Sequence, residues 1–176
     1  MGANISGKSV TTSRCNIEAV SFFARLRRFA WNAAPATPFA AGVAALGRRH
    51  VEEALSHFDA ALAAATTDGE RAVIHNKRGI AYVQARNIEA AVNAFLAALE
   101  IEPHVPAIVN VGNLLLEAGD VDEAIVHYEA ALRLDDEYAT AHLNLGVAYK
   151  RIGRRSDAVR EFRRANRLDG RLKRGG

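Results

Sequence analysis

The start of the chain carries the pattern of a phosphate-binding loop. Gly2, Gly7, Lys8 and Ser9 match G-x-x-x-x-G-K-[ST], in which backbone N–H groups and the lysine hold phosphate oxygens. That loop works only where a strand leads into it and a helix leaves it, and here only Met1 precedes Gly2. We therefore expect residues 1–16 to be a flexible basic leader and not a nucleotide site.

The histidines and the single cysteine indicate no catalytic or metal-binding site. The six histidines lie at spacings that form no metal triad, and Cys15 has no evident base nearby in the sequence. One cysteine also excludes a disulfide framework and a cysteine-based structural zinc site. We expect no enzyme activity, no metal and no cofactor, and core or boundary positions for His75 and His142.

The elements that would position any other site are defined by an internal repeat. After each of three glycines an aromatic residue or leucine follows at 3 residues, alanine at 12, an aromatic residue at 16 and alanine at 19. A weaker copy begins at Gly42, and the four glycines lie 37, 33 and 34 residues apart. The clear copies are Gly79, Tyr82, Ala91, Phe95, Ala98 with a closing Pro103; Gly112, Leu115, Ala124, Tyr128, Ala131; and Gly146, Tyr149, Ala158, Phe162, Ala165.

Each copy is predicted to form two antiparallel helices, because apolar residues recur at i, i+3, i+4 and i+7. The small residues of the series would let the two backbones approach closely, and the aromatic residues would fill the space between them. Asp120 and Glu123 are predicted to cap a second helix, and the last helix is expected over about residues 155–168. The two helices should be separated where residues tolerate a C-cap turn, at Arg86-Asn87, Gly119-Asp120 and Gly153-Arg154.

This series resembles the tetratricopeptide repeat, a helix–turn–helix unit of about 34 residues. The resemblance is close over residues 72–172 and reaches about residue 35 in the weaker copy. It implies an all-α solenoid with three clear repeats and one degenerate N-terminal repeat. The expected segments are 35–71, 72–104, 105–138 and 139–172, followed by a tail at 173–176.

The resemblance implies an interaction module without chemistry of its own, an adaptor or scaffold that binds a peptide or helix of a partner protein in a concave groove. The first helix of each unit would line that groove. Asparagine amides there can both donate and accept, so they can hold an extended peptide whatever its sequence; the alternative is that asparagine is the family's common choice at these positions and partly caps its neighbours. The expected groove residues are Asn76, Lys77, Ile80, Asn110, Asn113, Asn144, Val147, Lys150 and Arg151.

The N-terminal residues leave several roles open. Residues 17–33 place Phe22, Leu26 and Phe29 on one stripe, which predicts an amphipathic helix over 17–34 that ends before Pro35. That helix could cap the first unit, lie on a membrane surface, or belong to an organelle transit peptide. The start of the chain also fits the N-myristoylation pattern M-G-x-x-x-[ST].

Charge is distributed unevenly along the chain, although the net charge is only +3. Residues 1–34 hold five basic and one acidic residue, 35–138 hold seven and sixteen, and 139–176 hold eleven and three. The acidic middle favours a partner with a basic segment, or head-to-tail contact between copies. The basic end could be a solvated cap or a docking and self-association surface, whereas nucleic acid is a weaker alternative because no aromatic residues interleave. The outer face of the last helix is expected to carry Arg160, Arg163, Arg164 and Arg167.

The composition of the chain indicates whether it folds and where in the cell it is expected. With 49% hydrophobic and 24% charged residues, the chain is expected to fold, and its length suits one compact domain. No apolar run approaches the 18 residues of a transmembrane helix, and no secretory signal is evident. We expect a cytoplasmic protein, with a membrane-peripheral or organelle-targeted one as the alternative through the N-terminal leader.

Overall fold

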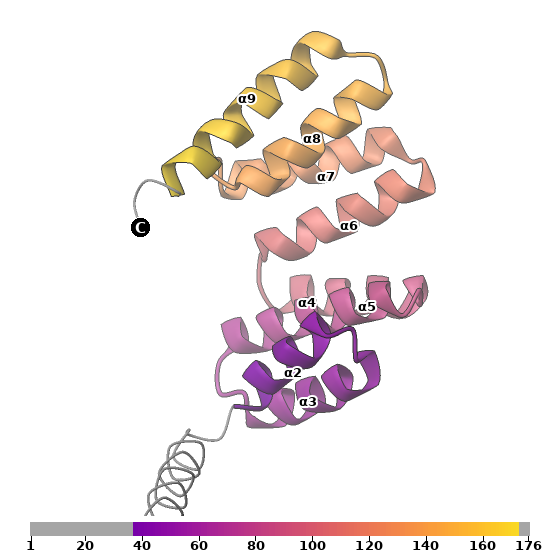
Figure 1. Ribbon diagram of the computed structural model, residues 1–176, viewed down its shortest axis with the longest axis vertical. Coiled ribbons are helices and arrows are strands. Elements are labelled where there is room, and N and C mark those ends of the chain that lie inside the picture. Colours follow the sequence, from indigo (N-terminus) through magenta and orange to yellow (C-terminus); the bar gives the residue numbers. More distant parts are fainter. Residues whose placement is uncertain (1–36, 173–176) are drawn as a thin grey trace, which may run out of the picture. The chain divides into compact units, whose positions relative to one another are not determined.

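The computed structural model describes residues 37–172, with the backbone alone for 171 and 172 (Figure 1). The predicted helix over 17–34 and the leader before it lie outside the described residues, so their membrane, targeting and acylation roles stay predictions. Within the described range every regular element is a helix, as expected. The helices are α2 (Pro38–Gly47), α3 (Val51–Ala64), α4 (Asp68–Gln84), α5 (Ile88–Ile101), α6 (Val105–Ala118), α7 (Val121–Leu134), α8 (Ala139–Arg151) and α9 (Arg155–Leu172).

Consecutive helices pack as antiparallel pairs, α2 with α3, α4 with α5, α6 with α7 and α8 with α9 (Figure 1). The second helix of each pair also packs on the first helix of the next pair. Such stacking buries apolar faces that a single pair could not cover. The prediction of a helical solenoid built from two-helix units is confirmed.

The small residues of the series allow close approach within each pair. A Cβ atom on Gly112 would lie 2.7 Å from Cε1 of Tyr128, so no side chain fits at that position. The same relation joins Gly42, Gly79 and Gly146 to the rings of Phe58, Phe95 and Phe162. Of the predicted repeat positions, Tyr82 and Phe162 are half-buried and Pro103 is exposed, while the other positions are buried except Leu115, which is half-buried.

The turns between paired helices lie where the sequence predicted them. Gly119 and Gly153 take φ values of 98° and 79°, and Arg86 takes 59°, so each unit turns through the left-handed region. Arg49 does the same in the first unit, with φ at 63°. The predicted cap of Asp120 with Glu123 is wrong, because the Asp120 side chain makes no capping hydrogen bond to α7.

A capping box that the sequence reading missed begins α4. The Glu70 N–H donates to Thr67 Oγ1 at 3.2 Å, and the Thr67 N–H donates to Glu70 Oε2 at 3.2 Å. α4 therefore begins at Asp68, inside the segment 35–71 assigned to the first unit. At the other end α9 continues to Leu172, past the expected residue 168, since Asp169 and Gly170 do not stop the helix.

The hydrophobic core consists of three clusters distributed along the units. One cluster surrounds Phe58 in α2, α3 and α4, and a second surrounds Tyr128 in α6 to α9. A small third cluster of Ala72, Ala98 and Ala107 connects α4 and α5 with α6. The middle junction is thus built from methyl groups, with Leu99 and Ile101 packed against it.

Candidate functional site

The predicted groove asparagines bond to one another across neighbouring units. Asn110 Nδ2 in α6 donates to Asn76 Oδ1 in α4 at 2.8 Å. Asn144 Nδ2 in α8 donates to Asn113 Oδ1 in α6 at 2.7 Å. These four side chains, which we call the asparagine face, therefore join the first helices of three successive units.

The bonds leave part of the amide capacity unused. Asn113 Oδ1 also accepts from the Tyr128 hydroxyl at 2.8 Å, so both of its lone pairs are engaged. Asn110 and Asn144 each use one N–H in these bonds, which leaves each a second N–H and a carbonyl oxygen. Both are half-buried, whereas Asn76 is buried. Asn110 and Asn144 can thus still form hydrogen bonds to a bound peptide.

The other predicted groove residues lie on the same helices with differing exposure. Lys77, Ile80 and Val147 are half-buried, while Lys150 and Arg151 are exposed. Arg151 Nη1 in α8 donates to the Leu116 carbonyl oxygen of α6 at 2.5 Å. Arg151 therefore connects two units in addition to facing solvent.

One buried acceptor on this set of helices has no partner. Gln84 lies five residues after Gly79, the position that Arg151 takes relative to Gly146. Its Oε1 is buried without a hydrogen bond, a condition shared in the described residues only by Arg78 Nε. Buried polar atoms are normally paired, so the unpaired Gln84 Oε1 is an exception in the packing of α4 and is not exposed to a ligand.

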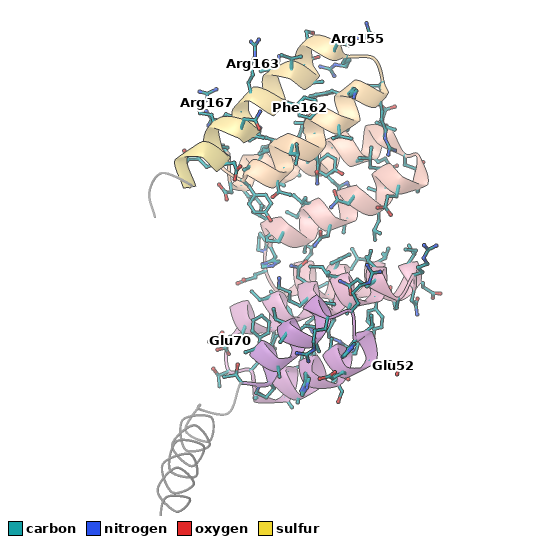
Figure 2. All side chains as sticks on the ribbon, in the orientation of Figure 1. Glu52, Glu70, Arg155, Phe162, Arg163 and Arg167 are labelled. Carbon is teal, nitrogen blue, oxygen red and sulfur yellow. The ribbon has the colours of Figure 1, made fainter. Side chains whose placement is uncertain are left out.

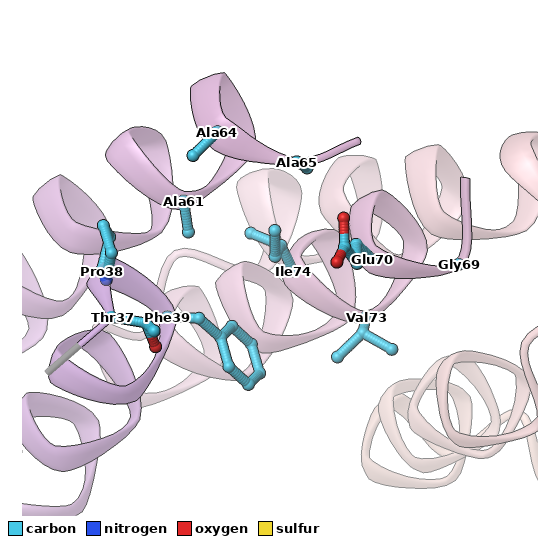
Figure 3. Close-up of a pocket in the computed structure, with 10 residues that line it drawn as sticks. All are labelled: Thr37, Pro38, Phe39, Ala61, Ala64, Ala65, Gly69, Glu70, Val73 and Ile74. Atoms are coloured by element: carbon cyan, nitrogen blue, oxygen red, sulfur yellow. The ribbon is translucent and has the colours of Figure 1, made fainter. Parts of the chain in front are cut away.

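An apolar pocket of about 510 Å³ lies where α2, α3 and α4 meet (Figure 3). α2 begins at Pro38, only four residues before Gly42, whereas α6 begins seven residues before Gly112. The first turn of α2, the end of α3 and the first turns of α4 form its walls. The lining residues are Thr37, Pro38, Phe39, Ala61, Ala64, Ala65, Gly69, Glu70, Val73 and Ile74. Sequence reasoning missed this pocket, although the closeness of Pro38 to Gly42 indicated a short helix.

Glu70 brings a carboxylate to the edge of this pocket. The backbone N–H groups of Thr66 and Thr67, with the Thr66 hydroxyl, hold the pKa of Glu70 below its usual value. The side chain is therefore an anion at neutral pH, beside otherwise apolar walls. This combination suits an apolar group with a neighbouring positive charge.

His75 lies at the boundary of the core and His142 lies within it, the two kinds of position predicted for these histidines. His75 is half-buried, and burial lowers its pKa, as it does for His104. His142 is buried, with Nδ1 2.8 Å from Glu161 Oε2 and Nε2 3.0 Å from the Asp136 carbonyl oxygen. Both ring nitrogens of His142 are thus used in bonds that connect α8 with α9 and with the loop before α8.

The described residues contain neither a metal-binding cluster nor a membrane-spanning helix. Between residues 37 and 172, no three histidine, cysteine, aspartate or glutamate side chains gather as a metal site would require. Over the same residues no helix combines the length and the apolar character needed to cross a bilayer.

Comparison with known proteins places the fold. A TPR repeat model matches residues 112–153, and two tetratricopeptide repeat models match 39–106 and 139–171. The crystal structure of MamA aligns at a TM-score of 0.62 and 19% identity, over 95% of this chain and 99% of that chain. A structure named MamA MSR-1 C2 aligns at 0.56 and 25% identity, over 77% and 76% of the two chains.

A third similar structure is YrrB, described as a TPR protein with an unusual peptide-binding site. It aligns at a TM-score of 0.56 and 22% identity, over 86% of this chain and 81% of that chain. At such identities the likeness shows a shared fold. The family models together span residues 39–171 apart from 107–111, and the chain therefore belongs to the tetratricopeptide repeat family.

Proposed function

We propose that this protein is a non-catalytic interaction module, an adaptor or scaffold that holds an extended peptide or a helix of a partner protein against α4, α6 and α8. Membership of the tetratricopeptide repeat family supports the general role of protein binding. The observation that carries the specific proposal is the spare amide capacity of Asn110 and Asn144, which repeats from one unit to the next.

The asparagine face would recognise the backbone of the partner. Each of Asn110 and Asn144 can donate to a peptide carbonyl and accept from a peptide N–H, and each such bond contributes about 1 kcal/mol net. The existing bonds to Asn76 and Asn113 hold the two amides in place before a ligand arrives, so less side-chain entropy is lost on binding.

The apolar pocket would add side-chain preference to this backbone recognition. Val73, which lines it, belongs to α4, the helix that also carries Asn76. An aliphatic or aromatic side chain of the partner would fill the pocket, and a neighbouring lysine or arginine would meet Glu70. YrrB, a protein of the same fold, is described as having a peptide-binding site, which is in keeping with this proposal.

Selection from a phage-displayed library of random linear peptides, followed by fluorescence anisotropy with the full chain, tests the proposal. We expect Asn110→Ala with Asn144→Ala to weaken a selected peptide roughly tenfold or more, since two to four bonds are lost. Asn93→Ala, at an exposed asparagine of α5, is the matched control and should leave the affinity unchanged. Unchanged affinity in the double variant, with helicity retained by circular dichroism, would show that the asparagine face is not the site.

A further inference from the structure

The last unit exposes a surface that earlier units use to pack on their successors. Three residues before the repeat glycine, Asn76 is 4% exposed and Val109 is 2% exposed, but Leu143 is 48% exposed. Asn76 accepts its hydrogen bond from Asn110 of the following unit, which shows that this position faces the next unit. Leu143 on α8 therefore presents an apolar side chain where the preceding units contact a further helix.

The second helix of the last unit repeats this relation. Ile125 in α7 and Val159 in α9 each lie thirteen residues after the repeat glycine of their own unit. Ile125 is 8% exposed, whereas Val159 is 46% exposed. Seventeen residues after the repeat glycine, Glu129 of α7 accepts a hydrogen bond from the Tyr149 hydroxyl of the following unit at 2.9 Å. Arg163 occupies the same repeat position in α9. The end face, defined as Leu143, Val147, Lys150, Val159, Arg163 and Asn166, thus has an apolar centre shared by two helices.

The rim of the end face is cationic. Lys150 occupies the repeat position that the buried Leu116 holds in the preceding unit. Arg163 likewise occupies the position of the acidic Glu129. No ion pair found among residues 37–170 includes Lys150 or Arg163, whereas Arg160 pairs with Asp157 and Glu161, and Arg164 with Asp136. Figure 2 shows Arg163 and Arg167 directed away from the ribbon, while Phe162 lies between α9 and α8. The expected arginine cap is therefore half neutralised and half free to meet an anion.

We propose that the end face binds an acidic amphipathic helix of another protein, seated where the first helix of a further repeat would lie. Apolar residues of that helix at i, i+3 or i+4, and i+7 would cover Leu143 and Val159. Flanking glutamate or aspartate residues would meet Lys150 and Arg163. A second copy docked by the same face is disfavoured, because the symmetric contact would bring these cations together. A nucleic acid would not use the apolar centre.

The probe is a synthetic fluorescein-labelled helix with a leucine stripe and glutamate flanks, compared with a peptide whose glutamates are all replaced by lysine. Anisotropy with the full chain should show binding of the acidic peptide, and at least roughly tenfold weaker binding of the lysine peptide. Val159→Asp and Arg163→Glu should each weaken the acidic peptide by a similar factor. Val126→Asp, at an exposed valine of α7 on another unit, is the matched control and should have no effect.

Several results would overturn the inference. Equal affinity for the acidic and the lysine peptide would show that the end face is not the site. An affinity for the acidic peptide that Val159→Asp does not change, with the melting curve unchanged, would show the same. Self-association in sedimentation velocity that Val159→Asp abolishes, without binding of the acidic peptide, would make a second copy the occupant. Binding of a duplex oligonucleotide that Arg163→Glu weakens and Val159→Asp does not, without binding of the acidic peptide, would assign the cations to nucleic acid. Asn110→Ala should not change acidic-helix binding, which separates this surface from the asparagine face.

Discussion

A Cβ atom placed on Gly79 would lie 2.3 Å from Cε1 and 2.5 Å from Cδ1 of Phe95. α4 and α5 therefore approach as closely as they do because position 79 has no side chain and the ring of Phe95 fills the space. Three other glycine–ring pairs repeat the contact, one in each remaining unit. Each contact is local to its own helix pair, and together they set the spacing of the stack.

Gly79→Ala should destabilise the protein by about 1–3 kcal/mol, because the added methyl group displaces a buried ring. Urea unfolding followed by circular dichroism measures the change. Gly47→Ala is the control, since an added Cβ meets nothing within 4 Å there, and the change should lie within about 1 kcal/mol of the parent chain. Equal stability of the two variants would contradict the packing argument.

Gly119→Ala should cost about 1 kcal/mol for a reason unrelated to packing. Nothing lies within 4 Å of an added Cβ there, but the φ of 98° is one that residues with a side chain rarely adopt. Thermal unfolding of Gly119→Ala beside Gly47→Ala isolates this backbone cost, because both sites have open space. If Gly47→Ala lowers the stability as much as Gly119→Ala does, the left-handed turn at residue 119 is not the source of the destabilisation.

Asn113 and Tyr128 should be energetically coupled, because the buried Tyr128 hydroxyl donates to Asn113 Oδ1. Asn113→Ala should cost about 1–3 kcal/mol, since it leaves that hydroxyl unpaired. Tyr128→Phe removes the unpaired group, so the double variant should be more stable than the two single losses imply, with a coupling of about 1 kcal/mol. Four chemical denaturation curves complete the cycle, and additivity within error would disprove the coupling.

Alkaline pH should destabilise the protein through Tyr128. Burial raises its pKa from 10.0 to about 12, so the folded state keeps the phenol neutral after the unfolded chain has lost its proton. Stability from this group is complete below pH 10 and declines between pH 10 and 12 by an amount on the order of 2 kcal/mol. Tyr128→Phe should show a smaller decline over that window in urea unfolding, and an identical decline would exclude Tyr128 as its cause.

The regular features of the fold could be predicted because each depends on short-range pattern. The helix periodicity, the glycine–aromatic spacing and the turns at Arg86, Gly119 and Gly153 follow from residues close in sequence. The predictions that failed concern ends of elements, where several residues compete. Thr67 with Glu70 forms the capping box, whereas Asp120 is the N-cap residue of α7 without a side-chain hydrogen bond; only the first pair has the Thr-x-x-Glu sequence of a capping box.

The sequence by itself determined a helical solenoid of two-helix units, because a strict repeat requires each unit to bury the same positions. Tertiary structure alone decided which side chains meet across units. The Asn110–Asn76 and Asn144–Asn113 bonds join residues 34 and 31 positions apart, and the pocket beside Glu70 is lined by residues of α2, α3 and α4. Only the stack also shows that Leu143 and Val159 are exposed, since burial depends on which helix lies next to each residue in space.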